Sequence, residues 1–128
     1  MRCIPLASRE AGSAVVGFSM VAPLMIAVFI AVLNVGSILS VRAVLSSAAQ
    51  TGARVAGNYG ATRAQGVSAA QQVLESRHLD SATLDVQPII SNGLRFIVVT
   101  ANYTTHVAWL NRDIQLSAVA RSLDENGL

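Results

Sequence analysis

No charged residue occurs between Ala11 and Val41, and this uncharged run constrains the fold more than any other feature of the chain. As a helix, the run would be about 46 Å long, which exceeds the roughly 30 Å hydrocarbon core of a bilayer. Its most apolar part, residues 14–33, contains eleven Val, Leu, Ile or Phe residues, which favour membrane insertion by roughly 3 to 7 kcal/mol. We therefore predict a transmembrane helix over residues 13–41, kinked at Pro23 because proline removes a backbone donor.

A secretory signal peptide is the alternative interpretation of this N-terminal run, with cleavage between Ser37 and Ser40. The apolar region of a signal peptide usually has 7–15 residues, so the length of the run favours a membrane anchor. Arginines flank both ends of the run, two on each side. The distribution of positive charge therefore does not set the orientation of the helix.

Composition excludes several classes of function. The net charge is only +2 and charged residues make up 12% of the 128 residues, which argues against a nucleic-acid partner. All nine basic residues are Arg, so lysine chemistry is excluded, and a single cysteine, Cys3, excludes an internal disulfide. The two histidines, His78 and His106, have no second ligand at metal-binding spacing, and no glycine-rich phosphate loop occurs. We expect no enzyme activity, no cofactor, no metal and no small-molecule substrate.

Beyond the membrane, the helix is expected to continue to about Gly57. Ala48, Gly52 and Ala56 follow one another at four-residue steps, which places three small residues on one face. Such a stripe lets another backbone approach closely, as between membrane helices. We therefore predict helix–helix packing at these residues, in preference to an alanine-rich surface helix.

A second helix and a small sheet are expected to follow. The helix is predicted from about Thr62 to His78, with Arg77 and His78 at the negative end of its dipole. Its inner face would carry Val67, Ala70, Val73 and Leu74.

Alternation and turn residues predict three antiparallel strands after Ser81. The first, residues 83–90, would place Leu84, Val86 and Ile90 on one side and Asp85 and Gln87 on the other. Pro88 makes it an edge or bulged strand. Asn92-Gly93 predicts a hairpin to a central strand, residues 94–105, and the last strand would cover residues 114–122. The fold class is therefore α+β, with the domains 1–12 (basic leader), 13–41 (transmembrane helix) and 42–128 (exported domain).

Trp109 lies in an apolar segment where a polar turn would be expected. Two interpretations remain open. The indole either folds back onto the second helix, as buried tryptophans usually do, or it is an exposed contact for a partner or for lipid.

Three segments of the chain resemble one known family. Residues 9–18 are similar to a short basic leader, a Gly at a processing site and the small residues that begin an apolar helix. Val21-Ala22-Pro23-Leu24 matches a frequent proline about a third of the way along that helix. Residues 48–56 match an Ala-Ala-x-x-Gly-Ala-Arg segment. Together with the hairpin and last strand, these features resemble the TadE-like minor pilins (pseudopilins) of the tight-adherence type IV pilus system.

The resemblance implies a prepilin peptidase that cuts after Gly12 and leaves Ser13 as the new N-terminus. It also implies a single-pass protein of the bacterial cytoplasmic membrane, with its C-terminal domain outside and partners among the other pilus subunits and the assembly platform. The chain departs from the pilin pattern at Gly17, where pilins generally carry Glu at the fifth mature position. In such pilins, the Glu carboxylate pairs with the N-terminal amine of a neighbouring subunit, and an unpaired charge inside the apolar filament is costly. A minor subunit or an assembly initiator tolerates the loss of this Glu more readily than a main subunit.

A second hypothesis does not involve pili. The run from Ala11 to Val41 could instead be only an anchor or an export signal for a small adaptor or binding domain. An intact leader, or cleavage near Ser40, would favour this hypothesis, whereas an N-terminus at Ser13 would favour the pilin.

Overall fold

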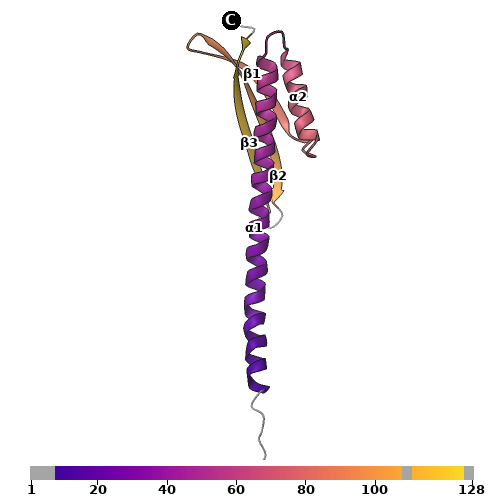
Figure 1. Ribbon diagram of the computed structural model, residues 1–128, viewed down its shortest axis with the longest axis vertical. Helices are drawn as coiled ribbons and strands as arrows, with labels where there is room; N and C mark the ends of the chain where they lie inside the picture. The colour runs from indigo at the N-terminus through magenta and orange to yellow at the C-terminus, as the bar shows by residue number, and fades with distance from the viewer. Residues whose placement is uncertain (1–7, 108–110, 126–128) are drawn as a thin grey trace, which may run out of the picture. The chain divides into compact units, whose positions relative to one another are not determined.

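The computed structural model describes residues 8–107 and 111–125, and Figure 1 shows its elements in chain order. Helix α1 spans Ser8–Gly57 and helix α2 spans Arg63–Glu75. The strands are β1 (Thr83–Ser91), β2 (Leu94–Val107) and β3 (Arg112–Leu123). The α+β layout, with a long apolar N-terminal helix, a second helix and a three-stranded antiparallel sheet, is confirmed.

The chain divides into two compact units, residues 1–38 and residues 39–128. The described part of the first unit is helical throughout and includes Pro23. Its apolar side chains are exposed; for example, Phe18 is 74% and Met20 is 78% accessible. Two of its polar side chains bond to the helix itself: Ser19 donates to the carbonyl of Val15 at 2.8 Å, and Asn34 donates to that of Ile30 at 2.8 Å. Because these polar atoms are satisfied internally, the helix is suited to an apolar environment.

The sheet of the second unit has the order β1-β2-β3, so β2 is central, as the sequence predicts. Pro88 lies on an edge strand, where a missing backbone donor is tolerated. Asn92 and Gly93 have φ of 53° and 80°, as a two-residue hairpin turn requires at both positions. The predicted hairpin is therefore confirmed, and β2 extends two residues beyond its predicted end.

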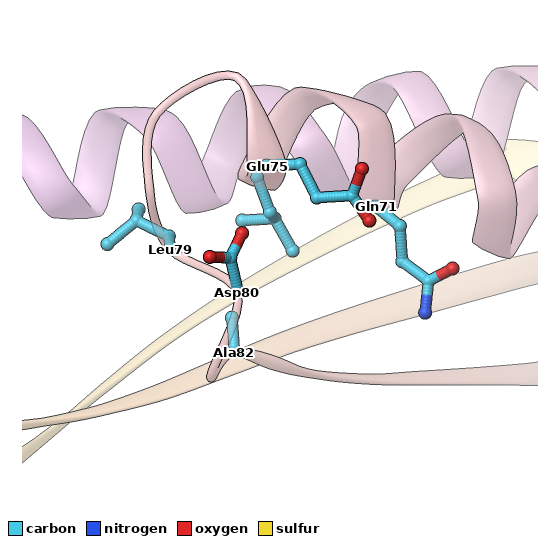
Figure 2. Close-up of a pocket in the computed structure, with 6 residues that line it drawn as sticks. Gln71, Glu75, Leu79, Asp80 and Ala82 are labelled. Carbon is cyan, nitrogen blue, oxygen red and sulfur yellow. The ribbon is translucent and has the colours of Figure 1, made fainter.

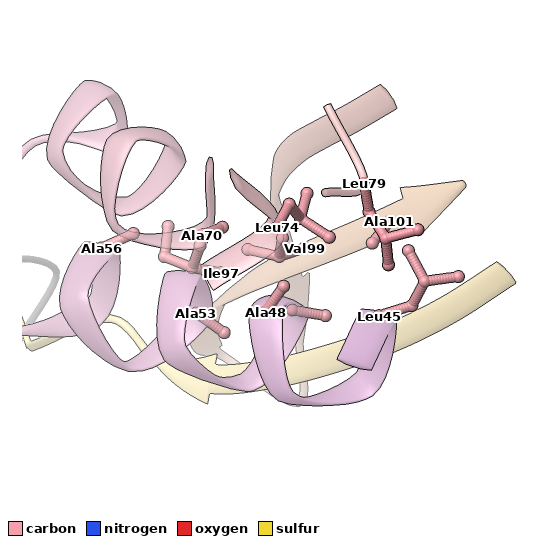
Figure 3. Close-up of a cluster of buried hydrophobic side chains, with 11 residues drawn as sticks. Leu45, Ala48, Ala53, Ala56, Ala70, Leu74, Leu79, Ile97, Val99 and Ala101 are labelled. Atoms are coloured by element: carbon pink, nitrogen blue, oxygen red, sulfur yellow. The ribbon is translucent and has the colours of Figure 1, made fainter. Parts of the chain in front are cut away.

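The core lies between the sheet and the helical residues of the second unit (Figure 3). Leu45 of α1 and Val99 of β2 are its largest fully buried side chains. Small residues dominate the rest, because the α1 segment of this unit presents mainly alanines to its neighbours. The buried cluster consists of Leu45, Ala48, Ala49, Ala53, Ala56, Ala70, Leu74, Leu79, Ile97, Val99 and Ala101.

Helix α2 begins with a capping box and ends earlier than predicted. The Thr62 hydroxyl accepts a hydrogen bond from the Gln65 amide, and the Gln65 side chain accepts one from the Thr62 amide. At the other end, no basic residue occupies the last turn, so the prediction that Arg77 and His78 belong to it is wrong. The physical reason is the left-handed backbone of His78, with φ of 57°, which ends the helix.

The hydrogen bonds after α2 form a Schellman motif. The Leu79 amide donates to the Leu74 carbonyl at 3.0 Å, and the His78 amide donates to the Glu75 carbonyl at 3.1 Å. Leu74 and Leu79, which flank the turn, are both buried in the core. This apolar contact commonly accompanies the motif and fixes the direction in which the chain leaves the helix.

Ile90 shares the side of β1 that carries Leu84 and Val86, but its side chain is 72% exposed. Leu84 and Val86, three and two alternations earlier on the same face, are packed against the core. Ile90 pairs with Arg95 close to the hairpin turn, and Figure 1 shows this end of the hairpin extending past the helices. The face of β1 thus alternates as expected, but the helices cover only part of it.

Candidate processing segment, membrane helix and helix-packing contact

Gly12 and Ser13 lie in the N-terminal part of α1. Ser13 is exposed, and so is Gly17. A Cβ atom added at Gly17 would have no atom within 4 Å. The helix surface at the position where pilins generally carry a glutamate is therefore open.

Within residues 8–107 and 111–125, one helix is long and apolar enough to cross a membrane. This helix is α1, and its candidate span, Ser13–Gly57, includes the predicted one, residues 13–41. None of its most apolar window is buried by the rest of the chain. An exposed apolar helix of this length fits a single-pass membrane anchor.

Gly52 and Ala56 lie in a close contact between α1 and α2 of the same chain, and Ala48 is buried in the core one turn before Gly52. Ala48 and Ala56 are 0% and 3% accessible. A Cβ atom added at Gly52 would lie 3.0 Å from the Cβ of Ala70 and 3.0 Å from the carbonyl oxygen of Gly66. The small residues thus allow the two backbones to approach each other, and the helix they meet is α2.

Gly66 is the partner that the sequence analysis missed. A Cβ atom added there would lie 2.5 Å from the Cβ of Ala56 and 2.7 Å from the carbonyl oxygen of Gly52. A signal was available: an isolated glycine within a helical pattern destabilises the helix by about 1 kcal/mol and usually has a packing reason. Gly66 and Ala70 also repeat the four-residue spacing of small residues found in α1.

The C-terminal end of β3 is attached to the helices and to β2. A Cβ atom added at Gly57 would lie 2.5 Å from the carbonyl oxygen of Leu123. The Asp124 amide donates to the Arg95 carbonyl at 2.9 Å, and the Arg95 Nε lies 3.7 Å from the Asp124 carboxylate, which is almost fully buried. Nothing in the local sequence predicts this role, because Asp124 stands in a short polar tail after the last strand.

Acidic residues line one pocket of about 220 Å³ beside the end of α2 (Figure 2). Glu75 and Asp80 contribute the carboxylates, and Leu74, Leu79 and Ala82 contribute apolar walls. Across the described parts of the chain, no group of three His, Cys, Asp or Glu side chains is placed to hold a metal ion. The absence of enzyme activity stays a prediction.

The two histidines have separate surroundings. His78 occupies the turn after α2. His106 faces Asp113 across β2 and β3, with 2.7 Å between its Nδ1 and the carboxylate, and both side chains are more than half exposed. An exposed pair of this kind contributes little to stability.

Trp109, the predicted partner contact, lies outside the described residues. Neither of its two interpretations is tested, and the hypothesis remains a prediction.

The N-terminal part of the chain matches a family model described as TadE-like protein, over residues 12–54. The matched segment begins at the predicted processing site, contains the whole apolar run after it and ends within the small-residue segment. No curated protein and no solved structure matches the chain. Over residues 12–54, the chain is thus similar to TadE-like proteins.

Proposed function

We propose that the chain is a minor pilin or pseudopilin that contributes to the assembly of a tight-adherence pilus, as a structural and non-catalytic subunit. One observation carries this proposal: the match to TadE-like proteins covers residues 12–54. That segment combines the Gly12–Ser13 junction with an exposed apolar helix.

The proposal places the apolar part of α1 in the bacterial cytoplasmic membrane and the second unit outside it. A prepilin peptidase would remove residues 1–12 on the cytoplasmic side. The mature chain would remain a single-pass subunit that meets other pilus subunits and the assembly platform.

Two parts of α1 differ in which surfaces are available to another subunit. The small residues Ala48, Gly52 and Ala56 are occupied by contacts within the chain. The side chains of residues 13–38 are largely exposed. Neighbouring subunits would therefore meet the apolar residues of α1 rather than the Ala48–Ala56 stripe.

Mass spectrometry of the membrane-extracted protein tests the proposal. The full chain is produced in cells with and without the prepilin peptidase of a tight-adherence system. We expect an N-terminus at Ser13 only when the peptidase is present. The matched control is Gly12→Val, which places a branched side chain at the junction and should leave the leader attached.

Two results would overturn the proposal. A wild-type leader that stays intact with the peptidase would remove the main support for a pilin. Cleavage near Ser40 would instead indicate an export signal and favour a secreted binding domain.

A further inference from the structure

A groove of about 380 Å³ lies between α1 and the C-terminal end of α2. Its polar groups are three serine hydroxyls and one guanidinium, and its apolar surface comes from an alanine and two valines. The lining residues are Ser40, Ala43, Val44, Ser47, Val73, Ser76 and Arg77. Hydroxyl donors beside an arginine are the groups that bind phosphate oxygens.

Arg77 is the one charged residue among those that line this groove. Arg77 is exposed, and no carboxylate of the described residues forms an ion pair with it. Glu75 and Asp80 line the separate pocket in Figure 2. The two carboxylates at this end of α2 therefore do not line the groove.

The last carbonyl groups of α2 do not oppose an anion as strongly as free ones would. The Leu74 and Glu75 carbonyls accept bonds from the amides of the Schellman turn. The Val73 carbonyl accepts a hydrogen bond of 2.7 Å from the Ser76 hydroxyl. Since the negative end of a helix dipole resides on unsatisfied carbonyls, these bonds reduce its repulsion of a phosphate.

The position of the groove along α1 indicates where its ligand comes from. Ser40 is next to the last residue of the uncharged run, and Arg42 is the first charged residue after it. A helical run of about 46 Å matches the roughly 40–45 Å of a bilayer that includes both headgroup layers. In a chain that spans the membrane with this run, Ser40 and Ala43 reach the headgroup layer.

We propose that this groove binds the phosphate group of an anionic membrane phospholipid. Arg77 pairs with the phosphate, and the hydroxyls of Ser40 and Ser47 donate hydrogen bonds to its oxygens. The walls formed by Val44 and Val73 contact the glycerol region. The inference rests on the membrane-spanning part of the proposed function, because it requires α1 to enter the bilayer.

Lipid retention by the full-length chain tests the inference. The chain is reconstituted with equal amounts of phosphatidylglycerol and phosphatidylcholine and extracted in mild detergent, and native mass spectrometry counts the lipids that remain bound. We expect phosphatidylglycerol to be enriched about fivefold, the effect of one arginine near an anionic surface. Arg77→Gln should abolish the enrichment, whereas Arg63→Gln, at the opposite end of α2, should preserve it.

A second variant separates the groove from charge alone. Ser40→Ala combined with Ser47→Ala keeps the net charge, and we expect it to lower the enrichment by at least half. Equal retention of the two lipids by the wild type would overturn the inference, and so would full enrichment in the serine variant. Displacement of the lipid by millimolar inorganic phosphate would also overturn it, because the groove would then be a site for the free anion.

Vesicle flotation distinguishes this inference from the membrane assignment. The chain is mixed with vesicles that contain phosphatidylglycerol and with vesicles of phosphatidylcholine alone. If it floats with both but retains neither lipid selectively, only the headgroup site is contradicted. A chain that floats with neither contradicts the membrane span, and the headgroup site with it.

Discussion

Gly66 of α2 lies directly against Ala56 of α1, so closely that a Cβ atom at Gly66 would be 2.5 Å from the Cβ of Ala56. Two carbon atoms cannot approach to this distance without movement of at least one backbone. The contact therefore explains why glycine occupies a helix interior, where it weakens the helix by about 1 kcal/mol relative to alanine. The carbonyl oxygen of Gly52 would lie 2.7 Å from the same added Cβ atom, so the two helices also meet backbone to backbone here.

Gly66→Ala should destabilise the second unit, although alanine is the better helix former. Overpacking a close contact typically destabilises by 1–3 kcal/mol, and about 1 kcal/mol of helix propensity offsets part of it. We expect a net loss of about 1–2 kcal/mol in the opening free energy of the Val99 amide, measured by hydrogen exchange on the full chain in detergent. The control is Gly36→Ala, where an added Cβ has no atom within 4 Å. If the Val99 amide were as protected in the Gly66→Ala chain as in the wild type, α1 and α2 could move apart to admit the added Cβ atom without loss of stability.

Leu45→Ala should destabilise the same unit more strongly. Leu45 is fully buried, and the loss of a buried leucine side chain typically destabilises by about 2–5 kcal/mol because it leaves a cavity. Leu39→Ala removes the same atoms from a side chain that is 60% exposed, so it should change the opening free energy of the Val99 amide by less than about 0.5 kcal/mol. Equal effects of the two substitutions would contradict the position of the core.

The local sequence contains enough information to predict most of the elements of the fold. A two-residue hairpin turn requires positive φ at both of its residues, and Asn-Gly is the pair that most readily adopts it. Asn92-Gly93, with alternating apolar residues on both sides, therefore predicts the hairpin. Pro88 restricts the first strand to an edge. The order of the sheet follows from these two features, because the strand after the hairpin must then be central.

The remaining features depend on contacts between distant residues. His78 ends α2 through a backbone conformation that histidine rarely adopts, so the sequence pattern alone extends the helix too far. Ile90 has the correct alternation, but its exposure depends on where the helices end. The small-residue spacing of α1 predicts a helix contact, yet the identity of the facing helix depends on Gly66 and Ala70, which lie in another element.

Thr62→Ala should weaken the beginning of α2. The Thr62 hydroxyl accepts from the Gln65 amide as part of a capping box, and replacing such a cap by alanine typically costs about 1 kcal/mol. We expect faster hydrogen exchange at the Gln65 amide and a loss of about 1 kcal/mol in the opening free energy of the α2 amides. Thr62→Ser keeps the hydroxyl and should retain most of the protection. Comparable exchange in the alanine and serine variants would show that the capping bonds contribute nothing.

His78→Gly should stabilise the second unit even though it removes a side chain. His78 has φ of 57°, a region that disfavours residues with a Cβ by about 1–2 kcal/mol and that glycine enters freely. The greater freedom of glycine in the unfolded chain offsets roughly 0.5–1 kcal/mol of this gain. The net increase in the opening free energy of the Val99 amide should thus be up to about 1 kcal/mol. His78→Val is the matched test of the same cause, because a β-branched side chain is strongly disfavoured at positive φ and should reduce the opening free energy by about 1 kcal/mol or more. If glycine lowered the stability and valine did not, the left-handed turn would have no part in ending α2, and the chain would leave the helix by another geometry.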